Sequence, residues 1–550
     1  MPTIDEQRAA DLSTLAVACL GRPLTTFESQ IIEESTTSAS SNPVPAPVKA
    51  GSVEGAFLRW IATDPKAAAF IDARGIRVNS LVLSGDLDLD NCSLSTSLML
   101  RDCEIVGSIR LDSAALKNVN FRRCTINGVI RGENAVVKGS FEIYKCILKS
   151  AVALDRLEVT GALSLSGTDA LQISGGDIRL DGAKIAGSVF LSEGFKTGVP
   201  VRMHNARMGE LDCSGAVLAS CDGSLSLDGV TINGDLTMSN GFNCPGEVRL
   251  PGAHIQGNLE CIGATIGSLI CHNMTVDGDF MWIDILNAAT ARLSLVGVKV
   301  KSFRDQKSTW PQPGNLELEG LVYELLTVHE DSASGVAPKG ELTPRKAFNA
   351  TDRIEWINRQ EDDRLREPQP WMQLAKVALA LGDESGSHKL VYTLSQHRAA
   401  QSPFLIRRAR IAFAWLREQP FRIAWSIIAI LIVSAGIFWA ASVTGAIAPR
   451  EKDSYAAWAK GQPFPAAYPR FNPVIYALEN ELPLVKFGQD DKWAPDPSHN
   501  PIALGPTCLL QWTAAFNSYS FLTFVRWFII VLGWIQATVL AGALGSRFKS

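Results

Sequence analysis

The sequence predicts a mainly β protein, in which a right-handed parallel β-helix is followed by a small helical module and two transmembrane helices. Three observations predict this class. Over residues 81–304 a short apolar motif returns every ten or eleven residues, and a fixed period is the signature of a repeat architecture. Helical periodicity replaces it after residue 351. Two long apolar runs lie near the carboxyl end of the chain.

The repeated unit combines an apolar-x-apolar strand with a small residue, a further apolar residue and often a glycine. Leu98, Ile109, Asn120 and Ile130 are taken as the first strand residues of successive units. Alternation places the two apolar strand residues on one face of the strand. We expect one unit to form half a coil, so that roughly ten coils of about 22 residues stack at ~4.8 Å.

The composition and the cysteines fit a β-helix in a reducing compartment. The chain has 550 residues, 20% of them charged, and a formal net charge of −4, a balance that predicts no nucleic-acid partner. Cys103, Cys124 and Cys146 lie one coil apart in the small inward position, so they should form an interior ladder. Without a C-x-x-C pair or a Cys/His cluster of zinc spacing, no metal or cofactor is predicted.

The amino-terminal part is predicted to close the first coil. Residues 1–50 should form helices near 6–20 and 25–35 and then a proline-rich linker, and they lack the pattern of a signal peptide. Residues 51–80 should provide a capping helix, with Ser52 as its N-cap and Asp64-Pro65 as its end. Such a cap is expected because an open coil exposes unpaired strand edges.

Two charged features of the predicted β-helix, residues 81–304, can each be interpreted either as ordinary solvated surface or as a functional site. Asp86, Asp88 and Asp90 alternate with leucines, so their carboxylates should face outward together. They are expected to be a solvated strand face, with calcium binding or polysaccharide cleavage as the alternatives. Arg110 and Arg131 should stack one coil apart, either as an ordinary charged surface or as a stripe that meets phosphate or anionic lipid.

A third feature suggests a docking surface late in the β-helix. Ile270, Met281 and Trp282 are expected to point outward. Exposed apolar residues in one place indicate a contact with another element or another chain. The helices that follow in sequence are the simplest occupant, and a separate protein partner is the alternative.

The chain then changes character. Residues 305–350 are predicted to be an exit segment, broken by prolines, and a mobile polar loop. Residues 351–402 should form a small module of three helices, the first capped by Thr351 and the second closed by Gly382, since they are joined by short connections.

The next segments place the protein at a membrane. Residues 403–422 form a basic amphipathic pattern expected to lie along a membrane surface, with the cations Arg407, Arg408, Arg410, Arg417 and Arg422. Residues 423–447 contain no charged residue, which is enough to span the hydrocarbon core. Residues 522–545 should form the second span. The arginines predict that both termini and the β-helix are cytoplasmic, which leaves residues 448–521 as an extracytoplasmic loop.

Side chains within the second span predict how it packs. Ala537, Ala541 and Gly545 recur at four-residue spacing, and faces of small residues let membrane helices approach closely, within one chain or between subunits. Gln536 is mid-span, where an amide needs a partner, so it is a candidate interhelix contact, with pore lining as the alternative. The loop is expected to be interfacial and structural, or else a sensing or gating element.

Several segments together resemble a known family. They are the repeats of GA-x-I-x-G type, the helix pair QPWMQLAKVALALGDESGSHKLVY, the loop FNPVIYALENELPLVKFGQDDKWAPD and the span GWIQATVLAGALG. The chain from about Gly51 onward is similar to a bacterial family of β-helical, two-span membrane proteins, often catalogued as membrane-associated oxidoreductases or pentapeptide-like repeat proteins. The resemblance implies the bacterial inner membrane and no particular catalytic residue. A G-x-G-x-x-G motif between a strand and a helix is missing.

The sequence therefore predicts a membrane-anchored cytoplasmic β-helix that acts as a scaffold for binding or assembly, with the lipid membrane and an unidentified protein as partners. An oligomeric membrane effector or channel gated by the β-helix is the first alternative, which would make the protein a homo-oligomer. A membrane-associated oxidoreductase or carbohydrate-active enzyme is the second, although no catalytic, cofactor-binding or metal-binding residue is predicted.

Overall fold

The computed structural model describes most of the chain: residues 3–37, 51–220, 224–330, 345–346, 348–400, 403–404, 406–408, 420–463, 467–482, 485–500 and 518–547. The chain divides into two compact units, residues 1–394 and residues 395–550. Each unit is described by itself below.

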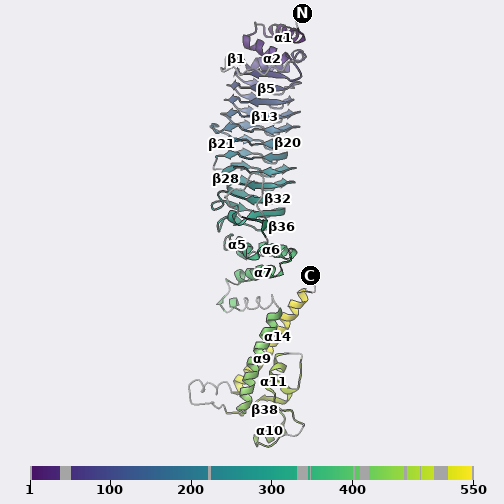
Figure 1. Cartoon of the computed structure of the whole chain (residues 1–550), viewed down its shortest axis with the longest axis vertical. Helices are drawn as coiled ribbons and strands as arrows, with labels where there is room; N and C mark the ends of the chain where they lie inside the picture. Colours follow the sequence, from purple (N-terminus) through teal and green to yellow (C-terminus); the bar gives the residue numbers. More distant parts are fainter. Residues whose placement is uncertain are drawn as a thin grey trace. The chain divides into compact units, whose positions relative to one another are not determined.

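The first unit is built on a parallel β-solenoid of about 11 turns (Figure 1). One turn consists of four short strands, namely β5 (Leu98–Arg101), β6 (Glu104–Ile105), β7 (Ile109–Arg110) and β8 (Ala115–Leu116). The chain then returns in β9 (Val119–Arg122), which pairs with β5 in parallel. The four strands continue from turn to turn as four ladders. The β6 and β7 ladders belong to a 19-stranded sheet, here sheet A, and the β5 and β8 ladders to an 18-stranded sheet, here sheet B.

The register confirms that two sequence units make one turn, and it corrects one position. Leu98 pairs with Val119 in β9, and Val119 pairs with Phe141 in β13 (Phe141–Tyr144). The third unit therefore begins at Val119 rather than at Asn120. The difference matters because a slip of one residue moves every side chain of a strand to the other face, and Val119 is buried whereas Asn120 is not.

Each unit turns its corner at a residue with left-handed backbone conformation. These residues recur at the unit spacing and include Asn91, Asp102, Asn134, Gly252 and Gly263. Glycine, asparagine and aspartate tolerate a positive φ best, which explains their recurrence. The corner immediately precedes the small inward residue, as in Asp102-Cys103. Cys103, Cys124 and Cys146 are each 1% exposed, and the Cys124 amide donates to Cys146 Sγ at 3.4 Å, which confirms the predicted ladder.

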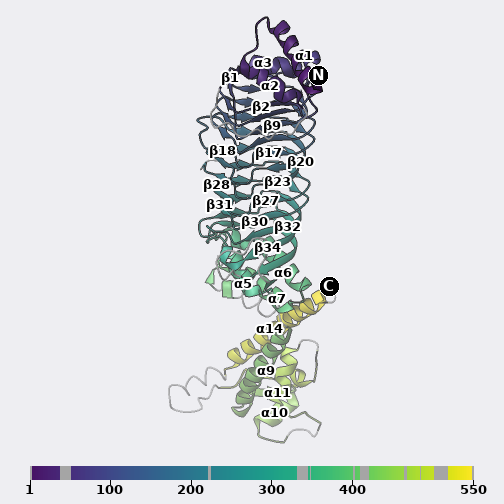
Figure 2. The same cartoon turned by 45° about the horizontal axis from the view of Figure 1, so that its top comes forward.

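Helices cover the amino-terminal end of the solenoid (Figure 2). They are α1 (Ile4–Leu20), α2 (Thr26–Thr36), α3 (Gly55–Thr63) and α4 (Pro65–Ala68). The predicted role of Ser52 as an N-cap is wrong, because Ser52 begins strand β1 (Ser52–Glu54), which pairs with β3 (Val82–Ser84). Helix α3 starts instead at Gly55, where a Cβ atom would lie 1.9 Å from the Asp86 carbonyl oxygen. The close approach of the two backbones requires glycine there.

The solenoid continues past the predicted end at residue 304. Strand β34 (Lys299–Gln306) pairs in parallel with β36 (Val322–His329), and β33 (Arg292–Ser294) pairs with β35 (Leu316–Glu317). The short strand β37 (Arg345–Lys346) then pairs antiparallel with β36. Residues 331–344, for which a mobile loop was predicted, lie outside the described residues.

The predicted helical module closes the carboxyl-terminal end of the solenoid. It consists of α5 (Ala350–Ile357), α6 (Pro368–Ala380) and α7 (Glu384–Ala399). Trp356 of α5 is 2% exposed, and its ring lies 5.8 Å from that of Phe303 in β34. The module therefore extends the hydrophobic core of the solenoid and covers its last strands.

The second unit contains two helices that are long and apolar enough to cross a membrane. Helix α9 (Pro420–Val443) includes the candidate span Ala424–Val443, and α14 (Tyr519–Arg547) includes Tyr519–Ala541. The segment between them forms α10 (Lys452–Ala459), α11 (Pro473–Glu481) and α12 (Gln489–Lys492), with a short antiparallel pair of β38 (Ile447–Pro449) and β39 (Trp493–Pro495). Helix α11 packs against both α9 and α14.

Candidate functional site

A long polar groove follows the outer face of sheet B, and we call it the sheet-B groove. Its first part is a cavity of 840 Å³ between α2 and the first turns, and its second part is a cavity of 760 Å³ further along the same face. Glu142 lines both parts. The groove thus runs from Arg77 in β2 (Ile76–Asn79) to Asn240, across several turns of the solenoid.

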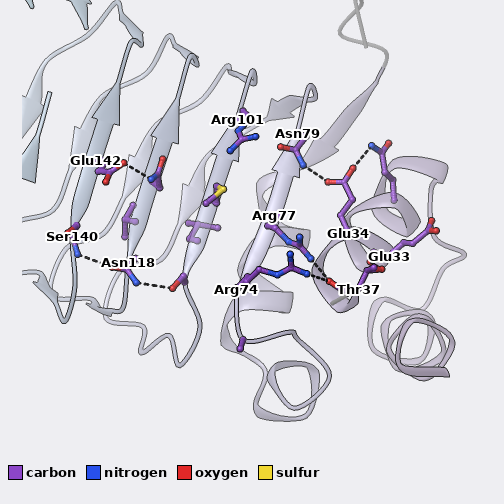
Figure 3. Close-up of a pocket in the computed structure, with 17 residues that line it drawn as sticks. Glu33, Glu34, Thr37, Arg74, Arg77, Asn79, Arg101, Asn118, Ser140 and Glu142 are labelled. Atoms are coloured by element: carbon purple, nitrogen blue, oxygen red, sulfur yellow. Dashed lines mark hydrogen bonds between the residues drawn. The ribbon is translucent and has the colours of Figure 1, made fainter. Parts of the chain in front are cut away.

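Helix α2 forms one wall of the first part (Figure 3). Arg74 and Arg77 both donate to the carbonyl oxygen of Thr37, at 2.7 and 2.8 Å. Asn79 donates to the Glu34 carboxylate at 2.6 Å. Burial, followed by the neighbouring charge of Arg74, lowers the pKa of Arg77. These contacts hold the end of α2 on the sheet, and they leave Arg77 cationic because its pKa starts far above neutrality.

Arg101 is a cation of the sheet-B groove without a hydrogen-bond or ion-pair partner among the described residues. Its guanidinium makes no hydrogen bond or ion pair with any residue that the structure describes, and its Nε atom is buried without a partner. The register places Asn79 on one side of Arg101 and Arg122 on the other, each one turn away. Arg122 is already paired with Glu142 at 2.8 Å. The Nε atom of Arg77 in the same groove is also buried without a partner, so Arg101 differs in that its other guanidinium nitrogens have no described partner either. An acceptor placed at Arg101 would supply the missing hydrogen bonds.

The second part of the groove is lined by several hydroxyl groups together with charged side chains such as Glu193 and Asp212. Tyr144 donates to Glu193 at 3.0 Å, and the Lys145 ammonium group lies 4.8 Å from the centre of the Tyr144 ring. Serines follow the strands from turn to turn, among them Ser164, Ser166 and Ser192. Hydroxyls both donate and accept, so this part can hydrogen-bond an extended polar chain.

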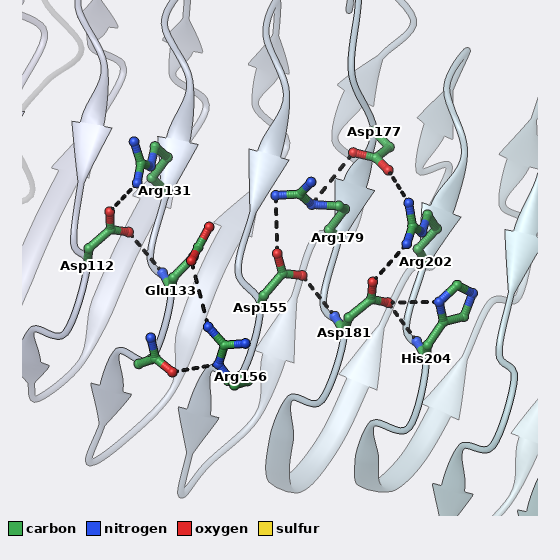
Figure 4. A network of polar contacts seen from close by, with 11 residues as sticks. Asp112, Arg131, Glu133, Asp155, Arg156, Asp177, Arg179, Asp181, Arg202 and His204 are labelled. Carbon is green, nitrogen blue, oxygen red and sulfur yellow. Dashed lines mark hydrogen bonds and ion pairs between the residues drawn. The ribbon is translucent and has the colours of Figure 1, made fainter.

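The charged stripe on sheet A is an internally paired ladder (Figure 4). Arg131 lies one turn from Arg110, as predicted, since the two residues pair in register. Arg110 binds Asp90 at 2.5 Å and Arg131 binds Asp112 at 2.6 Å. The same pattern recurs as Arg179 with Asp155 and Arg202 with Asp181 at 3.2 and 3.1 Å.

Each of these aspartates also supports the backbone of the next turn. Asp90 accepts the amide of Asp112 at 2.8 Å, and Asp181 accepts the amide of His204 at 2.8 Å. The ladder thus stabilises the stacking of turns. Of the three aspartates predicted to face outward together, Asp88 binds Arg59 at 3.1 Å and Asp90 binds Arg110. Among the described residues, no group of three or more His, Cys, Asp or Glu could hold a metal ion.

The predicted docking surface at Ile270, Met281 and Trp282 is corrected by the structure. Trp282 is 1% exposed and Met281 is 7% exposed. Trp282 pairs with the inward Cys261 in register, and neighbouring residues of one strand cannot both face outward. The Trp282 indole donates to the carbonyl oxygen of Thr309 at 2.9 Å, so the segment that follows β34 helps to cover the Trp282 side chain. Ile270 alone stays partly exposed, on the outer face of sheet A.

The basic segment before the first candidate span is described only in part. Arg407 and Arg408 are exposed, and the Arg408 guanidinium lies 4.7 Å from the centre of the Phe404 ring. Arg410 and Arg417 lie outside the described residues. Arg422 lies in α9, where only its backbone is described.

In the second unit, Gln536 joins the two long helices. Its Nε2 atom donates to Ser426 Oγ of α9 at 3.0 Å, and its side chain is 5% exposed. The face with small residues predicted for close packing is different from the face that is buried. Ala537 is partly exposed and Ala541 is exposed, whereas the buried side of α14 carries Ile529, Gly533, Gln536 and Val539. Gly545 lies in α14, and its burial is outside what the structure describes.

The sequence interpretation missed the sheet-B groove because it centred on Arg110 and Arg131 of sheet A and treated Arg122 only as a neighbour of that stripe. Arg77, Arg101 and Arg122 recur at outward strand positions in successive turns of sheet B. The same periodic reading applied to those units would have found these arginines.

Comparison with known proteins yields no match to a family model, to a curated protein or to a solved structure.

Proposed function

We propose that this protein is a membrane-anchored scaffold, in which the sheet-B groove binds an extended segment of a protein partner. The observation that carries the proposal is Arg101, which has no hydrogen-bond or ion-pair partner among the described residues and lies in an open groove with many hydrogen-bonding side chains. A carboxylate of the partner would supply the missing acceptor at Arg101. The hydroxyls and amides along the groove would bind the partner's backbone.

Anchoring is assigned to the candidate spans in α9 and α14. In each, only 22% of the most apolar window is buried inside the protein, so most of the apolar surface is open to a lipid environment. The exposed cations Arg407 and Arg408 precede the first span, which supports a cytoplasmic location for the β-solenoid and both termini. With the family resemblance, this favours the bacterial inner membrane.

The groove is tested by photocrosslinking with the full-length protein in its native membranes. A photoreactive amino acid is placed at Met99, inside the groove, and in a second variant at Ile270 on sheet A. We expect a crosslinked adduct from position 99 that disappears with Arg101→Ala and does not form from position 270. A crosslink from position 270 alone, or one from position 99 that is unaffected by Arg101→Ala, would contradict the proposal.

Topology is tested separately with Cys19, which is exposed on α1. We expect a membrane-impermeant maleimide to label Cys19 in inside-out vesicles and to leave it unlabelled in intact spheroplasts. Labelling in spheroplasts would place the amino terminus outside. That result would overturn the predicted orientation while leaving the groove proposal to the crosslinking experiment.

A further inference from the structure

Helix α11 inserts between the two candidate spans. Tyr476 and Ala477 are fully buried, and the Tyr476 ring lies 4.9 Å from that of Phe438 in α9, perpendicular to it. At the end of α11, the Glu481 carbonyl oxygen is so close to α14 that a Cβ on Gly533 would lie 1.9 Å from it. Gly533 therefore allows the last turn of α11 to touch the backbone of the second span.

The point of contact lies well inside the apolar segment. At ~1.5 Å per residue, Gly533 is about 21 Å along α14 from Tyr519 and about 12 Å from Ala541. Phe438 lies closer to the end of its own span, about 8 Å from Val443. Helix α11 thus enters beside the Val443 and Tyr519 ends, and its carboxyl-terminal residue reaches the interior of the two-helix unit.

The residue at that position is an acid without a partner. Glu481 is 1% exposed, and neither of its carboxyl oxygens has a hydrogen-bond partner among the residues that the structure describes. Glu479, two residues earlier on the same helix, is the opposite case. Its carboxylate accepts the amides of Phe487, Gly488, Gln489 and Asp490 at 2.8–3.2 Å.

The charged groups around Glu481 are already committed. On α14, Arg526 binds Asp490 of α12 at 2.6 Å and Asn480 of α11 at 3.2 Å. Glu479 caps the start of α12, and the candidate span of α9 carries no charged residue. The Tyr476 hydroxyl is buried, and burial raises its pKa to about 12, so it stays neutral. No described cation therefore remains to balance a Glu481 carboxylate.

A second unpartnered acceptor lies one turn along the same side of α14. The amide nitrogen of Gln536 donates to Ser426, and the Gln536 Oε1 atom is buried without a partner among the described residues. Gly533 and Gln536 share a face because they are three residues apart. Ca²⁺ and Mg²⁺ prefer six or more oxygen ligands, far more than these acceptors provide. A proton is the cation that a single isolated carboxyl can bind by itself.

We propose that Glu481 is a proton-binding site inside the second unit, and that binding of the proton holds α11 in place against α9 and α14. A neutral carboxyl is far less costly to bury in this position than an unpaired carboxylate. Loss of the proton should therefore release the last turn of α11 toward water. The inference does not rest on the binding proposed for the sheet-B groove.

Burial raises the pKa of Glu481 to about 7, which puts the transition in the physiological range. Because the pKa is higher in the packed state than in the released state, the packed state is favoured at low pH and loses stability as the pH rises from the pKa of the released carboxyl to about 7. The equilibrium for release should grow by up to about tenfold for each pH unit above the pKa of the released carboxyl, until the packed carboxyl itself ionises.

Two measurements on the full-length protein in lipid nanodiscs test the proposal. Infrared difference spectra should show a protonated carboxyl that titrates near neutral pH in the wild type, is lost in Glu481→Gln and persists in Asp491→Asn, whose carboxyl is exposed in the same loop. Titration of the same band in Glu481→Gln would overturn the site. Hydrogen exchange of the α11 amides, corrected for intrinsic rates, should accelerate from pH 6 to pH 8 in the wild type and in Asp491→Asn.

Glu481→Gln is permanently neutral, so its α11 amides should keep the same protection at both pH values. Equal pH dependence in Glu481→Gln and the wild type would show that α11 does not respond to this proton. Gly533→Leu provides the test of position, because it separates α11 from α14. We expect it to abolish the pH dependence and leave α11 unprotected at pH 6, and persistence of protection would contradict the packing described here.

Discussion

Arg353 in α5 and Asp305 in β34 form a two-bonded ion pair that is closed to solvent. The two nitrogen–oxygen distances are 2.7 and 2.6 Å, and both side chains are 0% exposed. The Trp310 indole also donates to Asp305, at 2.9 Å. This pair joins the helical module to the last turns of the solenoid, so it decides whether the carboxyl-terminal end of the solenoid stays covered.

Removing one member of this pair should release the module. Arg353→Met leaves the Asp305 carboxylate buried without its cation, which costs about 3–5 kcal/mol. Hydrogen exchange of the α5 amides should accelerate accordingly, and Arg353→Met with Asp305→Leu should recover much of the protection. The control is Lys307→Met, just after β34, which removes two partly exposed ion pairs with Asp352 and Glu355 of α5, each worth about 1 kcal/mol or less. Equal effects of Arg353→Met and Lys307→Met would show that burial of the pair is unimportant.

In the ladder on sheet A, the aspartate should matter more than the arginine that it binds. Arg202→Ala removes two surface ion pairs, with Asp177 and Asp181, each worth about 1 kcal/mol or less. Asp181→Ala also removes the acceptor of the His204 amide, which costs about 1–3 kcal/mol where that amide is shielded from water. Asp181→Asn keeps an acceptor oxygen and should resemble Arg202→Ala. Hydrogen exchange of the His204 amide measures how strongly each variant destabilises this turn. A larger acceleration in Arg202→Ala than in Asp181→Ala would contradict the prediction.

Acid should loosen the amino-terminal helices through Glu28. Hydrogen bonding by Arg22 lowers the pKa of Glu28 below its ordinary value of 4.5, and its carboxylate also accepts the Thr25 amide at 2.8 Å. Because the pKa of Glu28 is lowered in the folded state, its carboxylate stabilises the amino-terminal helices fully above pH 4.5. This contribution is lost as the pH falls through the lowered pKa. Circular dichroism and α2 amide exchange should show this loss in the wild type.

The variant Glu28→Gln should be less stable at pH 7 and should lose most of this acid sensitivity. Glu33→Gln, an exposed acid of the same helix, is the control and should behave as the wild type. An unchanged acid response in Glu28→Gln would assign the sensitivity to other groups.

The cysteine ladder should be chemically silent in the folded protein. Cys103, Cys124 and Cys146 are buried, whereas Cys19 is exposed. Hydrogen bonding to Cys124 and then burial raise the pKa of the Cys103 thiol, and the thiolate is the reactive form. Maleimide labelling followed by peptide mapping should modify Cys19 quickly and the three ladder thiols only after unfolding. Modification of Cys124 at the rate of Cys19 would show that the turns open readily.

Local periodic patterns predicted the solenoid well, because each turn repeats the same contacts with its neighbours. They gave two units per turn, the inward cysteines and the stacking of Arg110 with Arg131. They failed where the repeat meets another element. Ser52 looked like a helix cap, but it pairs with β3 as a strand, and Trp282 looked exposed, but the segment at Thr309 covers it.

The candidate sites depended even more on contacts between distant segments. The first part of the sheet-B groove exists because α2 lies beside turns of the solenoid that are distant in sequence, so the periodic arginines alone could not predict the cavity. In the second unit, Gln536 was recognisable from its place in an apolar run, and its contact with Ser426 follows from the need of a buried amide for a partner. The small-residue face was recognisable too, yet the buried side of α14 is a different one.

The sequence by itself determined the β-solenoid, its period, the two apolar helices and the basic residues before them, since these properties depend on which residues recur along the chain. Only the tertiary structure decided that Arg101 has no partner among the described residues, that Arg353 and Asp305 are closed to solvent together, and that α11 brings Glu481 against the long helix α14. The physical reason is that the burial and pairing of a charge depend on which distant segments pack around it.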